Sequence, residues 1–272
     1  MKFVTFNIRY DCGDDGENNF EFRKPFILQK IAQEKPDILC FQEVLPHVAV
    51  WLKENLADYY IVGCGRSVSL RDEQSAIAYR KERMNLMKMD TYWLSETPTV
   101  PGSRYPGQSV CPRICTEAVF EDMQTRQVFR VANAHLDNAG QLARKLALEQ
   151  ILKKVVADSF FGDVPIVVTG DFNMEPDWEE MQVLKEYPEF VNQTEHIGVT
   201  YHGYWKGDGQ SSIDFIITRG AVRCEQLEKW TDQRDGLYLS DHYPVCAELV
   251  LENQSLGEPG GETRNESTDV RH

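Results

Sequence analysis

The sequence is short of basic residues, and this shortage bears first on what the protein can bind. It has 29 Lys and Arg against 43 Asp and Glu, which gives a formal net charge of −14. Binding a long stretch of nucleic acid needs a basic face, so the balance disfavours nucleic acid as a partner without excluding it. The excess of acidic groups favours a compact phosphorylated substrate and a site that recruits divalent cations.

Three further features are missing from the chain. No apolar run approaches the roughly 20 residues of a membrane-spanning helix, so no membrane span is expected. No charged segment followed by an apolar one opens the chain as in a signal peptide, and a cytoplasmic location is expected. No internal repeat is visible, and 272 residues of which 42% are hydrophobic suit one large core or at most two small ones.

The seven cysteines are odd in number and scattered. Cys40 and Cys246 lie inside apolar runs, as reduced core residues of a cytoplasmic protein do. Cys111 and Cys115 are spaced so that they could pair or bind a metal, but no second pair of Cys or His has zinc-like spacing. A structural zinc is therefore disfavoured.

Segments with strand and helix patterns alternate along the chain, which predicts one α/β domain over residues 1–252. Helices are expected at 22–34, 46–56 and 139–157, the last capped by Asn138. Strands are expected at 3–8, 37–41, 60–63, 76–79, 84–94, 115–120, 128–134, 166–169, 213–218 and 245–251. The loop 95–112 is expected to surround a pocket, and the tail 253–272, which has almost nothing apolar, to be disordered.

Polar side chains stand at the ends of these apolar strands, where packing gives them no role. Asp171 and Asn173 follow the apolar run 165–169, and buried oxygen-bearing groups need water, a metal or a substrate to satisfy them. The pattern recurs at Asn7, Gln42-Glu43, His135, Asp214 and Ser240-Asp241-His242. Each alone fits a turn or cap residue, or for His135 a satisfied core histidine. Six such coincidences in one chain favour a functional site.

Oxygen ligands from Asp, Glu and Asn suit Mg²⁺ or Mn²⁺ rather than zinc or copper. A metal neutralises phosphate charge and helps to generate hydroxide, and a carboxylate beside the attacking water can orient or deprotonate it. A histidine can stabilise charge on a phosphoryl oxygen. This set of side chains predicts hydrolysis of a phosphoester.

The order of the motifs resembles that of the endonuclease/exonuclease/phosphatase superfamily, which has the DNase I-like fold. The motifs are Thr5-Phe6-Asn7, Gln42-Glu43, Asn133-Ala134-His135-Leu136, Gly170-Asp171-Phe172-Asn173, Ser212-Ile213-Asp214 and Ser240-Asp241-His242. The resemblance covers about residues 2–251 and implies a four-layer α/β sandwich of two packed mixed sheets with helices outside. It also implies a Mg²⁺-dependent phosphodiesterase or phosphomonoesterase. Segments such as 14–18, 93–98 and 200–204 are similar to a bacterial branch related to nocturnin-like and deadenylase-like enzymes.

The resemblance implies a role for each motif residue. Glu43 would hold Mg²⁺ or Mn²⁺, with Asn7 and Asp241 beside it. Asp171 would orient or deprotonate the attacking water, and Asn173 would help to hold the phosphate or the water. His242, paired with Asp214, would contact the phosphate from one side, and His135 would contact it from the other. Substrate-binding roles are expected for Glu73 as the partner of His135, for Arg113 and Arg144 at a phosphate, and for His202 at the rim. A surface charge, a salt bridge and solvent exposure are the respective alternatives for Glu73, Arg113 and Arg144.

Three hypotheses about function follow. The leading one is a divalent-metal-dependent phosphoesterase acting on a small nucleotide, sugar, inositol or lipid-like phosphate by in-line attack of water. The second is a nuclease, a 3′ exonuclease or an endonuclease on RNA or DNA, which the superfamily permits and the net charge disfavours. The third is a binding protein on the same fold without catalysis, which the complete set of metal and acid–base residues disfavours. The sequence leaves the substrate, mono- or diester specificity, the number of metals and the oligomeric state open.

Overall fold

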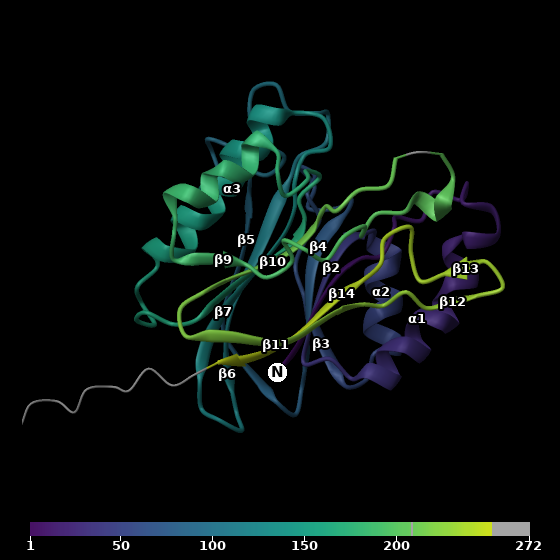
Figure 1. The fold of residues 1–272 in the computed structure, drawn as a ribbon, viewed down its shortest axis with the longest axis horizontal. Helices are drawn as coiled ribbons and strands as arrows, with labels where there is room; N and C mark the ends of the chain where they lie inside the picture. Colours follow the sequence, from purple (N-terminus) through teal and green to yellow (C-terminus); the bar gives the residue numbers. More distant parts are fainter. Residues whose placement is uncertain (208, 252–272) are drawn as a thin grey trace, which may run out of the picture.

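Two mixed sheets pack face to face, and helices cover the outer face of each (Figure 1). The structure is a computed structural model and describes residues 1–207 and 209–251, so the predicted tail 253–272 lies outside the described residues. In Figure 1, α1 (Phe20–Glu34) and α2 (Pro46–Asn55) lie on one side and α3 (Gln141–Ala157) on the other. The predicted four-layer α/β sandwich is therefore confirmed.

Each large sheet has six strands. The first has the order β11 (Val222–Lys229), β14 (Val245–Leu251), β1 (Lys2–Asn7), β2 (Ile38–Val44), β4 (Gln74–Arg80), β3 (Tyr59–Val62). The second has the order β5 (Met84–Trp93), β6 (Ile114–Asp122), β7 (Val128–His135), β8 (Ile166–Asp171), β10 (Asp214–Arg219), β9 (Phe190–Asn192). The smaller elements are the hairpin β12 (Gln233–Arg234) and β13 (Leu237–Tyr238) and the 3₁₀ helices η1 (Gly16–Asn18), η2 (Glu179–Glu186) and η3 (Gly203–Trp205).

The layers follow from the alternation of apolar side chains along the strands. In β2, Ile38 and Cys40 face the core between the two sheets, whereas Leu39 and Phe41 face the core under α1 and α2. Successive side chains of a strand point to opposite faces, so a continuous apolar run fits a strand that is buried on both faces. A third core lies between the second sheet and α3.

The strands β9, β11, β12 and β13 were not expected from the sequence, and the starts of two helices differ from the expected ones. Helix α1 begins at Phe20 because the side chain of Asn19 accepts a hydrogen bond from the Glu21 N–H and caps the helix. The expectation that Asn138 caps α3 is wrong, since the cap residue is Gly140 and the Asn138 side chain accepts instead from Arg113. None of the described helices is long and apolar enough to cross a membrane.

Strand register brings the polar residues to one edge of the sandwich. The parallel pair β1–β2 places Asn7 opposite Gln42, and the parallel pair β7–β8 places His135 opposite Asp171. The antiparallel pair β8–β10 places Asp214 opposite Asp171 on its other side. Because β1 also contacts β8 across the sandwich, the ends of strands from both sheets converge.

Close packing of β8 against β7 depends on Gly170. Its backbone has φ +145, and a Cβ at this position would lie 1.8 Å from the carbonyl oxygen of Ala134. No side chain fits without moving a strand, so Gly170 keeps the two strands close enough to place Asp171.

Gly170→Ala should lower the free energy of unfolding by about 3 kcal/mol or more, because the added methyl must displace backbone. Gly209→Ala is the matched control, since a Cβ at Gly209 would meet nothing within 4 Å, and it should stay within about 0.5 kcal/mol of wild type. Urea unfolding curves measure both, and equal stability of the two variants would contradict the close approach.

Candidate active site

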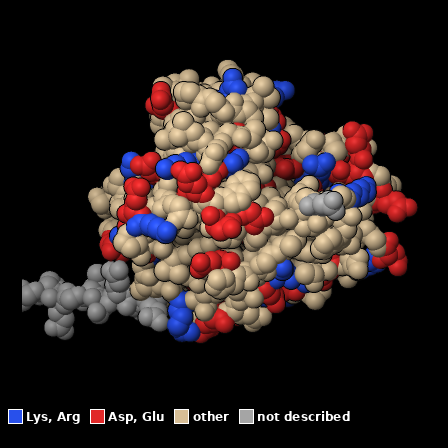
Figure 2. Space-filling model, turned by 45° about the horizontal axis from the view of Figure 1, so that its top comes forward, with Lys and Arg blue, Asp and Glu red and all other residues tan. Residues whose placement is uncertain are grey.

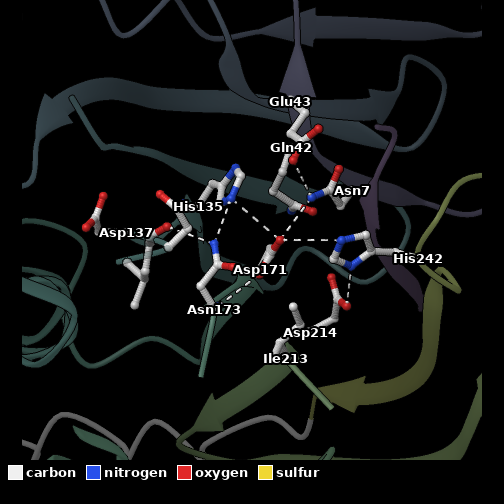
Figure 3. A network of polar contacts seen from close by, with 12 residues as sticks. Asn7, Gln42, Glu43, His135, Asp137, Asp171, Asn173, Ile213, Asp214 and His242 are labelled. Carbon is white, nitrogen blue, oxygen red and sulfur yellow. Dashed lines mark hydrogen bonds and ion pairs between the residues drawn. The ribbon is translucent and has the colours of Figure 1, made fainter. Parts of the chain in front are cut away.

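A connected group of polar side chains fills the edge where the strand ends meet (Figure 3). Asn7 and Glu43 come from β1 and β2 of the first sheet, and His135, Asp171 and Asp214 come from β7, β8 and β10 of the second. Asn173 and His242 join them from the segments that follow β8 and precede β14. The structure therefore brings together the residues that the sequence predicts at the ends of strands.

The amide of Asn7 links the two sheets. Its Nδ2 donates to Glu43 Oε1 at 3.1 Å and to Asp171 Oδ2 at 2.9 Å, while its Oδ1 accepts from the Arg9 N–H at 3.0 Å. The nitrogen rather than the oxygen of Asn7 thus faces the carboxylates. A half-turn of this amide would exchange the two and present an oxygen ligand to the same space.

Asp171 lies at the centre, within reach of both histidines. Its Oδ2 is 3.5 Å from His135 Nε2 and 3.7 Å from His242 Nε2, and its Oδ1 accepts from the Asn173 N–H at 2.9 Å. Burial raises the pKa of Asp171 to about 7, with the charges of Asp214 and Glu43 adding to the rise and that of His242 opposing it. A carboxyl group with this pKa can exchange a proton near neutral pH.

His242 is held as a cation between two carboxylates. Burial alone would lower the pKa of its imidazole. The charge of Asp214, the 2.8 Å contact from Nδ1 to Asp214 Oδ2 and the charges of Asp171 and Asp241 together outweigh burial and raise the pKa to about 10. The second ring nitrogen, Nε2, points to Asp171. The ring can therefore donate hydrogen bonds from both nitrogens.

His135, in contrast, is neutral. Burial lowers the pKa of His135 well below its usual range, and the charges of Arg113 and Arg66 lower it further. Its Nε2 accepts from Asn173 Nδ2 at 3.0 Å, which leaves the proton on Nδ1, 4.0 Å from Glu73 Oε2. The predicted pairing of Glu73 with His135 thus has a geometric basis, and one neutral and one charged imidazole flank Asp171.

Two site residues have left-handed backbone conformations. Glu43 has φ +62 at the point where the pairing of β2 with β4 shifts register, and Asn173 has φ +52. Such conformations cost roughly 1–3 kcal/mol each for residues other than glycine and concentrate at functional sites. At Glu43 the irregularity turns the carboxylate out of the sheet pattern and toward the site.

A cavity of about 750 Å³ opens above this group. Of the predicted site residues it is lined by Glu43, Glu73, Arg113, His135, Asp171, Asn173, Asp241 and His242. Asn7 and Asp214 lie behind these residues and act on them through the contacts above. The loop predicted at 95–112 contributes one residue to the cavity wall, Cys111.

Two predicted substrate contacts are wrong in this structure. Arg144 is buried, and its Nη2 lies 2.7 Å from Glu180 Oε1, so it neither lines the cavity nor meets solvent. His202 is 1% exposed and packs against Tyr238 and Tyr243, away from the cavity wall. Both side chains contact residues that lie at least 36 positions away in the sequence.

Other residues line the cavity without having been predicted from the sequence. These are Arg9, Tyr10, Arg66, Asn138, Glu175, Trp178, Tyr201, Ser211 and Ile213. Arg66 Nη2 lies 2.7 Å from Glu73 Oε1, and Arg9 Nε lies 3.6 Å from Asp241 Oδ2. Arg9 lies two positions after the motif residue Asn7, and this spacing is the one feature of the sequence that could have predicted it. No feature of the sequence marks Arg66.

Thr200 fixes the pair of Asp214 and His242 from below. It is fully buried, and its hydroxyl oxygen accepts from the N–H groups of Ile213 at 3.0 Å and Asp214 at 3.1 Å. Its carbonyl accepts from the Tyr243 N–H at 2.7 Å. One residue thus ties the start of β10 to the segment that carries His242.

The acidic groups of the site suit a hard divalent cation. Ligand atoms of Glu43, His135 and Asp171 lie within 4.8 Å of one another, as do those of Asp171, Asp214 and His242. Burial raises the pKa of Glu73 to about 7, and repulsion from Glu43 adds to the rise as it does at Asp171. A cation among these carboxylates would remove this repulsion, and the donors are mostly oxygen.

Comparisons with known proteins identify similar sequences and folds. A family model described as the Endonuclease/Exonuclease/phosphatase family matches residues 4–242. A solved endonuclease/exonuclease/phosphatase from Bacteroides vulgatus is 31% identical with a TM-score of 0.85, the match covering 92% of this chain and 98% of that one. A mannosyl-6-phosphatase from Bacteroides thetaiotaomicron is 26% identical with a TM-score of 0.83, covering 92% and 99%.

Among curated proteins, Nocturnin of Drosophila melanogaster is 31% identical over 169 residues, which cover 58% of this chain and 24% of the fly protein. The chain spans less than two thirds of the length of the curated relatives that it matches.

Thr200→Val should lower the free energy of unfolding by about 1–3 kcal/mol, because two buried N–H groups lose their acceptor. Thr200→Ser keeps the hydroxyl and should therefore retain most of the wild-type stability. Chemical denaturation of the three proteins measures the effect, and a valine variant as stable as the serine variant would rule out the proposed anchoring.

Proposed function

The chain belongs to the endonuclease/exonuclease/phosphatase family, and on that premise we propose that it is a divalent-metal-dependent phosphoesterase acting on a small phosphorylated substrate. The observation that carries the proposal is the position of Asp171 in the cavity wall between a neutral and a charged histidine. This arrangement provides a proton acceptor and donors for phosphate oxygens within one small space.

In the proposed reaction Asp171 orients the attacking water and accepts its proton. Its pKa of about 7 makes it a base of suitable strength near neutral pH. Asn173, anchored to Asp171 through its backbone N–H and to His135 through its side chain, helps to hold the water or the phosphate.

Charge on the phosphoryl oxygens is stabilised by His242, which Asp214 keeps protonated. His135 lies on the other side of Asp171 and acts through Asn173, whose side-chain amide donates to its Nε2. Arg113 lines the same cavity, although its Nε lies 3.6 Å from Asp137 Oδ1 and its Nη2 donates to Asn138 Oδ1 at 3.1 Å. A guanidinium carries five N–H donors, so one held by protein partners can still donate to a phosphate oxygen.

Glu43 would hold Mg²⁺ or Mn²⁺, with Asp241 and Asn7 beside it. When bound, the cation would neutralise phosphate charge and lower the pKa of a bound water.

A small substrate is favoured over a nucleic acid. On the face shown in Figure 2, Lys and Arg side chains lie among Asp and Glu and form no continuous basic stripe. The structurally similar mannosyl-6-phosphatase supports a sugar phosphate as one candidate. A nuclease remains the second hypothesis, and digestion of labelled single-stranded RNA and DNA decides between them.

Asp171→Asn should lower kcat for phosphate release by about 10²–10⁴-fold, because the amide cannot accept the proton. Release is measured over a panel of sugar phosphates, inositol phosphates and nucleotides with Mg²⁺ or Mn²⁺. Glu54→Gln, which neutralises an exposed carboxylate on α2, is the control and should match wild type. The absence of turnover in wild type, or an unimpaired Asp171→Asn variant, would refute the proposed function.

Removal of divalent cations should abolish the same activity, and Mg²⁺ or Mn²⁺ should restore it. Glu43→Gln should weaken Mn²⁺ binding in a calorimetric titration, since one ligand charge is lost. Activity that persists at full level in excess chelator would contradict the assigned role of Glu43.

A further inference from the structure

One aromatic side chain in the cavity wall has no part in the chemistry described above. Trp178 precedes η2, is 43% exposed and lines the same cavity as Asp171 and Asn173. Its backbone N–H donates to the carbonyl of Glu175 at 3.2 Å, which ties it to the turn that follows the Asp171 strand. A half-exposed indole in the wall of a ligand cavity offers an apolar surface to the uncharged part of a substrate.

The ring of Trp178 rests on Arg144. The guanidinium carbon of Arg144 lies 5.3 Å from the centre of the ring, within the range of a cation–π contact. The indole is thereby supported by a fixed group from α3.

Arg144 is itself held firmly. Its Nε and Nη2 donate to Glu180 Oε1 at 3.0 and 2.7 Å, and its Nη1 donates to the Asp137 carbonyl at 3.2 Å. Both Arg144 and Glu180 are buried, and burying an ion pair gives little net stability by itself. The pair instead fixes a planar group behind Trp178, so the ring is pre-positioned before any ligand arrives.

Three residues with hydrogen-bonding side chains line the same cavity as Trp178. They are Asn138, Glu175 and Ser211. Among the described residues, the Glu175 carboxylate accepts from the Ser212 N–H alone, at 3.2 Å to Oε1 and 3.1 Å to Oε2, and so retains lone pairs for further donors. An aromatic side chain in one cavity with hydrogen-bond acceptors and a hydroxyl matches a sugar ring, which has an apolar C–H face and hydroxyl groups at its edge.

We infer that Trp178 is the platform for the ring of a sugar phosphate, and that Arg144 is the positioning residue that holds the platform in place. The inference rests on the proposed function for the position of the phosphate. It assigns the substrate class to a hexose phosphate rather than to a ring-free phosphate such as glycerol 3-phosphate. It also gives Arg144 a role in place of the phosphate contact that the sequence predicted.

Binding is measured by calorimetric titration of Mg²⁺-loaded Asp171→Asn protein with mannose 6-phosphate, glucose 6-phosphate, glycerol 3-phosphate and AMP, so that turnover does not interfere. Trp178→Ala in this background should weaken binding of the hexose phosphates about tenfold, the scale of one stacking contact, and leave glycerol 3-phosphate within about twofold. Trp178→Phe keeps an aromatic face and should retain most of the affinity. Hexose phosphates that do not bind, or that bind the alanine variant equally well, overturn the inference, as does a loss confined to AMP.

Arg144→Lys tests the support separately in the active protein. The shorter, non-planar ammonium should raise KM for the hexose phosphate several-fold with kcat nearly unchanged, and should leave both constants for glycerol 3-phosphate unchanged. An equal loss on both substrates would show a purely structural role and overturn this part. Failure of wild type to release phosphate from any substrate would refute the proposed function, whereas the binding titration would still decide the role of Trp178.

Discussion

The site depends on hydrogen bonds that join two separate sheets across the sandwich. The amide of Asn7 on β1 bonds to Asp171 on β8, and the amide of Asn133 on β7 donates to the carbonyls of Phe41 and Ala76 at 2.8 and 2.9 Å. Gln42 donates to Asn133 Oδ1 at 2.7 Å, with both residues fully buried. Buried amides of this kind must be satisfied, so they fix the separation and register of the sheets.

Because the two sheets are fixed relative to each other, two imidazoles beside Asp171 can have different charges. His242 and His135 are both buried beside Asp171, yet the pKa is raised in the first and lowered in the second. The difference comes from their partners, since Asp214 contacts His242 directly whereas His135 faces two arginines and a more distant Glu73. Rigid placement of partners, rather than residue type, sets these properties.

The sequence predicts the parts of this structure that follow from local patterns. Buried strands such as β8 appear as apolar runs. The polar residues at their ends converge because β1–β2 and β7–β8 are parallel pairs, and because β10, antiparallel to β8, begins where β8 ends. The edge strand β11 was missed because it pairs with β14 at the edge of the sheet and none of its residues is buried, so it carries no apolar run. Arg144 and His202 were misplaced because their partners are set by tertiary packing: Glu180 lies 36 residues from Arg144, and Tyr238 packs on His202 from another hairpin. Trp178 gives no local signal, since its role depends on a cavity that exists only after folding.

The most direct measurement of the central claim is a crystal structure of the protein with Mn²⁺ and inorganic phosphate, in which anomalous scattering locates the metal. The account predicts Mn²⁺ bound to the Glu43 carboxylate and phosphate between His135 and His242, with Asp171 facing the phosphorus. Mn²⁺ absent from Glu43, or phosphate bound elsewhere with the cavity empty, would contradict it.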